Sequence, residues 1–148
     1  MPTVRRGRTL DSTPEALWAL VADPHHLPRW WPRVQRVEDA TPEAWTVVLA
    51  SPRGRPVRAD FTRVRAERPT RLVWRQEVEE TPFEGFLADA ETEVTLTAEG
   101  AQGTRVELEA REKLRGISSL GGLMVRRATR KRLDQALAGL AAIAGPGA

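Results

Sequence analysis

The feature that most constrains this sequence is a long segment near its C-terminus, roughly Ser118 to Ala144, which contains no proline and many good helix formers. Its second half carries Leu133, Leu137 and Leu140 at a spacing that places apolar side chains on one face of a helix. Such a stripe is stable in water only when it packs against another element. The rest of the chain must therefore supply an apolar surface for this helix.

The first half of the same helix face is different, because Gly122, Arg126 and Thr129 occupy the positions that continue the leucine stripe. Two interpretations fit this pattern. Either the helix breaks at Gly121-Gly122 and leaves Arg126 in solvent, or it is continuous and its first half faces a cavity rather than a packed core. In the second case we expect Arg126 to point toward the sheet, where its charge needs a partner, water or an anionic ligand group.

Length and composition favour a single soluble domain, residues 1–148, because a chain of 148 residues is long enough to bury a substantial core. Cysteine is absent, which excludes disulfides and thiolate chemistry. The N-terminus has no apolar run typical of a signal peptide, and no stretch approaches the ~20 apolar residues of a membrane span. We therefore expect a cytoplasmic protein without a stable membrane anchor.

Ahead of the last helix, the pattern predicts one strand, two short helices and then six strands. The first strand is Thr3 to Leu10; one helix follows Asp11-Ser12-Thr13-Pro14 and runs to about Ala22, and a second covers Leu27 to Trp31. Turn residues separate the later strands, which we place at Val34–Glu38, Trp45–Ala50, Pro56–Ala66, Arg71–Glu80, Phe83–Ala98 and Thr104–Glu112.

Alternation along these strands gives the sheet one apolar face. The inner positions include Trp45, Val47, Leu49, Leu72, Trp74, Gln76, Val78, Thr92, Val94, Leu96, Val106, Leu108 and Ala110. Pro56–Ala66 is ambiguous, because either Val57, Ala59 and Phe61 or Asp60, Thr62 and Val64 could face inward, and we expect a bulge there. The prediction is an α+β fold, in which a curved antiparallel sheet of about seven strands wraps around the last helix.

Several short motifs resemble those of the SRPBCC superfamily, the START-like, Bet v 1-like and polyketide cyclase/dehydrase proteins. The matching stretches are Thr13-Pro14-Glu15-Ala16-Leu17-Trp18, Asp23-Pro24, Leu27-Pro28-Arg29-Trp30-Trp31-Pro32, Pro69-Thr70-Arg71-Leu72-Val73-Trp74 and Gly103-Thr104-Arg105-Val106. The resemblance implies the helix-grip fold and a cavity for a hydrophobic ligand. It leaves function open, since the superfamily includes lipid carriers, hormone receptors, cyclases, co-chaperones and ribosome-associated proteins.

We expect ligand-binding side chains on the inner strand faces, on the second short helix and on the first half of the last helix. They are Trp30, Trp45, Phe61, Trp74, Gln76, Thr92, Val94, Gly122, Arg126 and Thr129. Tryptophan supplies most of the aromatic residues, and the alternative role of its side chains is core packing. A cofactor is not indicated.

No catalytic set is visible, and the candidate polar groups are Asp60, Arg126 and His26. Either Asp60 or Glu84 would be the inner partner of Arg126. His25 and His26 are adjacent, which disfavours joint ligation of one ion, so no metal site is predicted.

The basic residues Arg126, Arg127, Arg130, Lys131 and Arg132 go around the helix rather than along one side, which disfavours a nucleic-acid partner. The leading hypothesis is binding or transport of a small hydrophobic molecule, such as a lipid, a polyketide or an aromatic compound, by a monomer or homodimer. A polyketide cyclase or dehydratase acting in the same cavity is the alternative, and a protein-interaction module is the second.

Overall fold

The computed structural model describes residues 3–51, 53–116 and 119–144; for residues 119 and 120 it describes the backbone alone. The described strands form one antiparallel sheet in the order β1-β7-β6-β5-β4-β3-β2. The strands are β1 (Thr3–Leu10), β2 (Val34–Glu38), β3 (Ala44–Ala50), β4 (Pro56–Glu67), β5 (Arg71–Glu77), β6 (Leu87–Glu99) and β7 (Gly103–Leu114). The helices are α1 (Pro14–Val21), α2 (Leu27–Trp30) and α3 (Ser119–Ala144), with short 3-10 turns η1 (Pro24–His26) and η2 (Pro82–Gly85).

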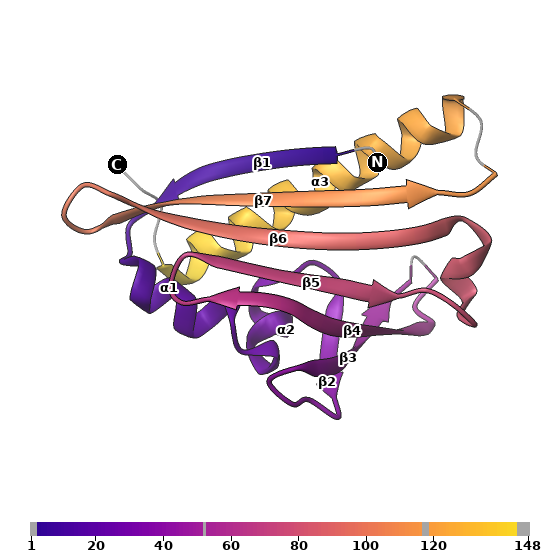
Figure 1. Ribbon diagram of the computed structural model, residues 1–148, viewed down its shortest axis with the longest axis horizontal. Helices are drawn as coiled ribbons and strands as arrows, with labels where there is room; N and C mark the ends of the chain where they lie inside the picture. The colour runs from indigo at the N-terminus through magenta and orange to yellow at the C-terminus, as the bar shows by residue number, and fades with distance from the viewer. Residues whose placement is uncertain (1–2, 52, 117–118, 145–148) are drawn as a thin grey trace.

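The sheet curves around α3, which crosses behind β1, β6 and β7 (Figure 1). Helices α1 and α2 lie near the C-terminal end of α3. Strands β2 to β7 form a meander, and β1 pairs with β7 along its full length, from Thr3 opposite Arg111 to Leu10 opposite Thr104. This confirms the predicted helix-grip architecture. No helix in the described part of the chain is long and apolar enough to cross a membrane.

Helix α3 is continuous from Ser119 to Ala144, so of the two interpretations the continuous helix holds and the break at Gly121-Gly122 does not occur; the expected start, Ser118, lies outside the described residues. The leucine stripe is confirmed, because Leu133 and Leu140 are fully buried and Leu137 is nearly so. These side chains belong to the same core as the inner faces of β1, β6 and β7.

In strand β4, whose inner face was ambiguous, Ala59 lies in the core and Phe61 packs against it. The inner face of this strand is therefore the set of Val57, Ala59 and Phe61. Its partner ladder shifts register between Arg63 and Arg65, which is the expected bulge. Asp60 therefore faces outward.

The predicted strand Phe83–Ala98 begins too early, because η2 occupies its first residues and β6 starts only at Leu87. Pro82 and the side chain of Thr81, which accepts a hydrogen bond from the Phe83 amide, start a helical turn instead of a strand. The predicted strand Arg71–Glu80 is also shorter in the structure, since β5 ends at Glu77.

The outer face of the sheet carries several acids, and arginines pair with them. Glu93 accepts hydrogen bonds from Arg71 at 2.7 Å and from Arg111 at 2.9 Å. Burial raises the pKa of the Glu93 carboxyl, but the hydrogen bonds and charges of the two arginines outweigh it and leave the pKa below its ordinary value.

Candidate ligand-binding cavity

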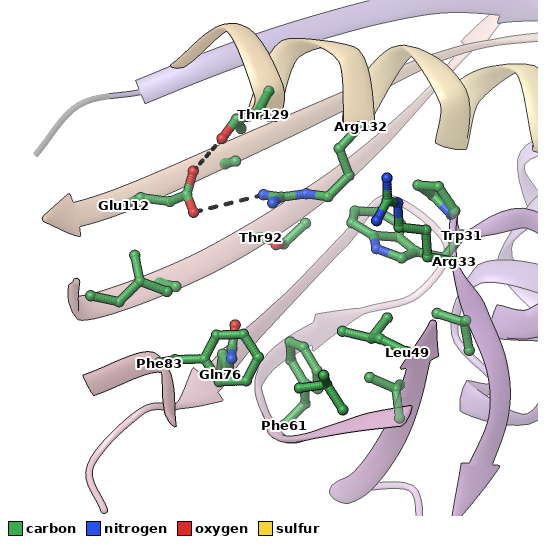
Figure 2. Close-up of a pocket in the computed structure, with 18 of the residues that line it drawn as sticks. Trp31, Arg33, Leu49, Phe61, Gln76, Phe83, Thr92, Glu112, Thr129 and Arg132 are labelled. Carbon is green, nitrogen blue, oxygen red and sulfur yellow. Dashed lines mark hydrogen bonds and ion pairs between the residues drawn. The ribbon is translucent and has the colours of Figure 1, made fainter. Parts of the chain in front are cut away.

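A cavity of about 660 Å³ lies between the inner face of the sheet and helix α3 (Figure 2). Strands β3 to β7 form its floor, η2 and the segment after α2 form its ends, and α3 contributes its roof. The helix side chains that border it are Val125, Ala128, Thr129, Lys131, Arg132 and Gln135.

The cavity exists because the inner positions at the centre of the sheet carry small side chains. Trp74 pairs with Thr92, and Thr92 pairs with Ala110, so only one large side chain occupies this row of three strands. In the next row, Ala90 lies opposite Glu112. A core has the density of an organic crystal when large side chains fill it; here the space above Ala90, Thr92 and Ala110 remains open.

Aromatic rings wall one side of the cavity. Trp31 lies edge-on to Trp74 with ring centroids 5.7 Å apart, and Trp74 lies edge-on to Trp45 at 6.2 Å. Trp45 stacks on Phe61 at 6.2 Å with an interplanar angle of 11°. Because these rings fix one another, the wall is a rigid apolar surface.

A carboxylate lies on the opposite wall, where β7 approaches α3. The Thr129 hydroxyl donates a hydrogen bond of 2.6 Å to Glu112 Oε1, and Arg132 Nη2 lies 3.8 Å from Glu112 Oε2. Figure 2 shows both side chains reaching from α3 toward Glu112. The Glu112 side chain is only 14% exposed, so Thr129 and Arg132 provide the contacts that a partly buried charge requires.

A second polar group borders the cavity near Phe83. Gln76 lies opposite Phe61 on the inner face, and its Nε2 atom is shielded from water without a hydrogen-bond partner among the described residues. A buried amide without a partner costs free energy unless a ligand or water supplies an acceptor. Gln76 is therefore a candidate anchor for a ligand oxygen.

Six of the predicted ligand-binding residues border the cavity: Trp45, Phe61, Trp74, Gln76, Thr92 and Thr129. Trp30 and Val94 do not border it. Both are core residues, at 2% and 1% exposure, and the adjacent Trp31 takes the place predicted for Trp30. Gly122 also lies outside the lining.

Arg126 is exposed and does not border the cavity, so its predicted inward direction is wrong. The helix face over the cavity is Val125, Ala128, Thr129 and Arg132, with the exposed Lys131 and Gln135 also bordering it. A shift of one residue turns a helical side chain by about 100°. The first turns of α3 also extend beyond the start of β1 (Figure 1), so Arg126 lacks the cover that Leu133 has.

The two acids proposed as inner partners of Arg126 have other roles. Asp60 lies on the outer face and accepts a 2.5 Å hydrogen bond from the Thr46 hydroxyl. Glu84 lies in η2 and accepts a hydrogen bond from the Glu80 amide at 2.7 Å. Neither borders the cavity.

His26 lies in η1, with Nε2 3.7 Å from Asp23 Oδ2, and does not border the cavity either. The described part of the chain contains no group of three histidine, cysteine, aspartate or glutamate side chains that could hold a metal ion.

Sequence reasoning missed Glu112, Arg132 and Trp31. The signal for Glu112 was present: it follows Ala110 by two residues and continues the inward alternation of Val106, Leu108 and Ala110. Arg132 lies three residues after Thr129 on the same helix face.

Comparison with protein families gives a match over residues 1–145 to the family described as polyketide cyclase / dehydrase and lipid transport. The chain belongs to this family. The family's description includes both chemistry and transport, so membership is consistent with a ligand-binding or cyclase role for the cavity without deciding between them.

Solved structures share the fold at low sequence identity. A START superfamily protein from Mycobacterium smegmatis has a TM-score of 0.77 at 11% identity, covering 96% of each chain. TTHA0849 from Thermus thermophilus has a TM-score of 0.72 at 24% identity, covering 94% of each chain. BexL, a di-domain ARO/CYC from the BE-7585A biosynthetic pathway, has a TM-score of 0.78 at 21% identity, covering 95% of this chain and 45% of BexL. A direct comparison with curated proteins gives no match.

Proposed function

We propose that this protein binds a small hydrophobic molecule in the cavity between the sheet and α3. The observation that carries the proposal is the cavity itself, whose volume of about 660 Å³ lies within the range of ligand pockets, roughly 300–1,000 Å³. Rigid rings wall one side, and the small side chains of Ala90, Thr92 and Ala110 keep the space open. A structural core would have filled it.

The polar groups restrict the orientation of such a ligand. Gln76 offers an amide N–H on β5, and Glu112 offers acceptor oxygens on β7, with β6 between them. Neighbouring strands are about 4.8 Å apart, so the backbones of these residues are roughly 10 Å apart. A flat apolar molecule with an oxygen acceptor at one side fits this arrangement, as a lipid, a polyketide or another aromatic compound would.

Tryptophan fluorescence tests the proposal, because Trp31, Trp45 and Trp74 border the cavity. We expect at least one member of a panel of fatty acids, apolar dyes and aromatic polyketides to change the emission with a micromolar Kd, which corresponds to about 8 kcal/mol of binding free energy. A Trp18→Phe variant is the control, because Trp18 lies outside the cavity and the response should persist. Absence of binding at micromolar concentrations across the panel would disprove the proposal.

A second candidate function, a cyclase or dehydratase reaction in the same cavity, is favoured by the position of Glu112. A carboxylate held by Thr129 beside an apolar space is a reasonable general base for removing a proton next to a ligand carbonyl. Glu112→Gln should then reduce turnover of a poly-β-ketone substrate by about 10²–10⁴-fold while leaving its affinity within a few-fold. Unchanged turnover in this variant would exclude Glu112 as the base, and absence of turnover in the unmodified protein would favour simple binding.

A further inference from the structure

We infer that the preferred ligand is an apolar molecule carrying one carboxylate, held where Arg33, Lys131 and Arg132 border the cavity. This inference rests on the proposed binding function and adds the chemical class of the ligand. It starts from the charges around the cavity rather than from its apolar wall.

Three cationic side chains border the cavity among the described residues. Arg33 lies between α2 and β2, and Lys131 and Arg132 lie on α3. Figure 2 shows Arg132 descending from α3 and Arg33 beside Trp31, with Phe61 and Leu49 on the far side of the open space. Arg33 therefore adjoins the aromatic wall at Trp31, whereas Arg132 extends toward Glu112 on the opposite wall, so the two guanidinium groups lie on either side of one part of the cavity.

These cations are poorly neutralised. Within the described ranges, Arg33 and Lys131 form no ion pair, in contrast to outer-face arginines such as Arg71, which lies 2.7 Å from Glu93. Arg132 reaches Glu112 only at 3.8 Å, longer than the 2.7–2.9 Å of a charge-assisted hydrogen bond, and so keeps donors for a ligand.

The acids at the cavity do not cancel this charge. Glu91 borders it, but Glu91 alternates with the inward-facing Thr92 and its carboxylate lies 3.8 Å from Arg75. Glu112 faces inward and takes its short hydrogen bond from Thr129. Three cations against one inward carboxylate leave a net positive charge at the cavity. Arg33 and Lys131 are themselves exposed, so this charge lies on the solvent side of the cavity, where it would attract an anionic head group.

The backbone at Arg33 is a separate observation. Arg33 has φ of +66°, a left-handed conformation that is uncommon for residues other than glycine and asparagine. Its carbonyl accepts a hydrogen bond from the Ala50 amide at 2.9 Å, which fixes this turn against the end of β3. The chain thus holds an arginine, in a conformation that costs free energy, at the edge of the cavity.

A matched pair of probes tests the inference: a dansyl-labelled undecanoic acid and its methyl ester, which share the apolar body. We expect the acid to bind about tenfold more tightly than the ester at low salt, with the preference shrinking as the salt concentration rises. The double variant Arg33→Asn, Lys131→Gln should lose most of this preference and keep the ester's affinity. Asparagine is chosen because it tolerates a positive φ.

The control is the double variant Arg126→Gln, Arg127→Gln, which removes two exposed charges of α3 outside the cavity lining and should retain the preference. Equal binding of acid and ester, or a preference that survives the Arg33 and Lys131 substitutions, would overturn the carboxylate inference and leave the binding function standing. If neither probe binds, the carboxylate inference fails, and the panel of fatty acids, dyes and polyketides described above decides separately whether the binding function stands.

Discussion

Replacing Ala90 with tryptophan should weaken ligand binding at least tenfold while leaving the protein folded. Ala90 borders the cavity and lies opposite Glu112 in the β6–β7 ladder. A tryptophan at this inward position extends into the space that the small side chains keep open. The new ring replaces part of the ligand rather than compressing a filled core, so we expect only a small change in the melting temperature.

Thr95→Trp is the matched control for this experiment. Thr95 lies on the same strand at an outward position, between Arg71 and Glu107. The substitution adds the same ring to β6 without entering the cavity, so binding should remain within a few-fold of the unmodified protein. If Ala90→Trp binds the ligand normally, the ligand site is elsewhere; if both variants lose binding, distortion of β6 rather than occupied space is responsible.

The parts of the site that depend on strand alternation could be predicted from the sequence. Trp45, Trp74, Gln76 and Thr92 occupy inward positions of strands with a clear period of two, and all of them border the cavity. The missed Glu112 obeys the same rule one step further along β7. Alternation is a local property of each strand. Once the inner face is known, the short turns between neighbouring strands fix their register.

The parts that depend on how α3 sits over the sheet could not be predicted. Helical spacing correctly grouped Leu133, Leu137 and Leu140, but it could not say which neighbouring stripe faces open space. The leucines of α3 pack on β1 and β7. The neighbouring face of the helix, from Val125 to Arg132, lies over the middle of the sheet and borders the cavity, so it is rotated from the leucine stripe. This offset arises from the curvature of the sheet, a tertiary property. Arg126 was therefore misplaced.

Trp30 and Trp31 illustrate a similar limit. Both residues lie in the same short segment, where the pattern cannot decide which ring faces the core. In the structure, Trp30 is 2% exposed and belongs to the core, whereas Trp31 borders the cavity. The choice follows from the contact between α2 and α3, at Gly139.

Gly139→Ala should destabilise the protein, even though alanine is the better helix former. A Cβ at this position would meet the main chain of Trp30, lying 2.9 Å from its Cα and 3.0 Å from its carbonyl carbon, with the carbonyl oxygen closer still. These are backbone atoms, so relief requires α2 and α3 to move apart. Overpacking costs about 1–3 kcal/mol, against a propensity gain of up to about 1 kcal/mol.

We therefore expect Gly139→Ala to lower the free energy of unfolding by about 1–2 kcal/mol, or the melting temperature by roughly 2–8 °C. Ligand binding should weaken as well, because α2 carries the adjacent Trp31 to its place on the cavity wall. Circular dichroism melts and the fluorescence titration measure the two effects.

Gly122→Ala supplies the opposite control within the same helix. A Cβ there would meet no atom within 4 Å, so only helix propensity acts. The free energy of unfolding should rise by up to about 1 kcal/mol, and the melting temperature should rise with it. A gain at Gly122 together with a loss at Gly139 would show that the close approach of α2 fixes the cavity wall. A gain at both positions would show that α2 yields easily, and the rigid aromatic wall would then need another explanation.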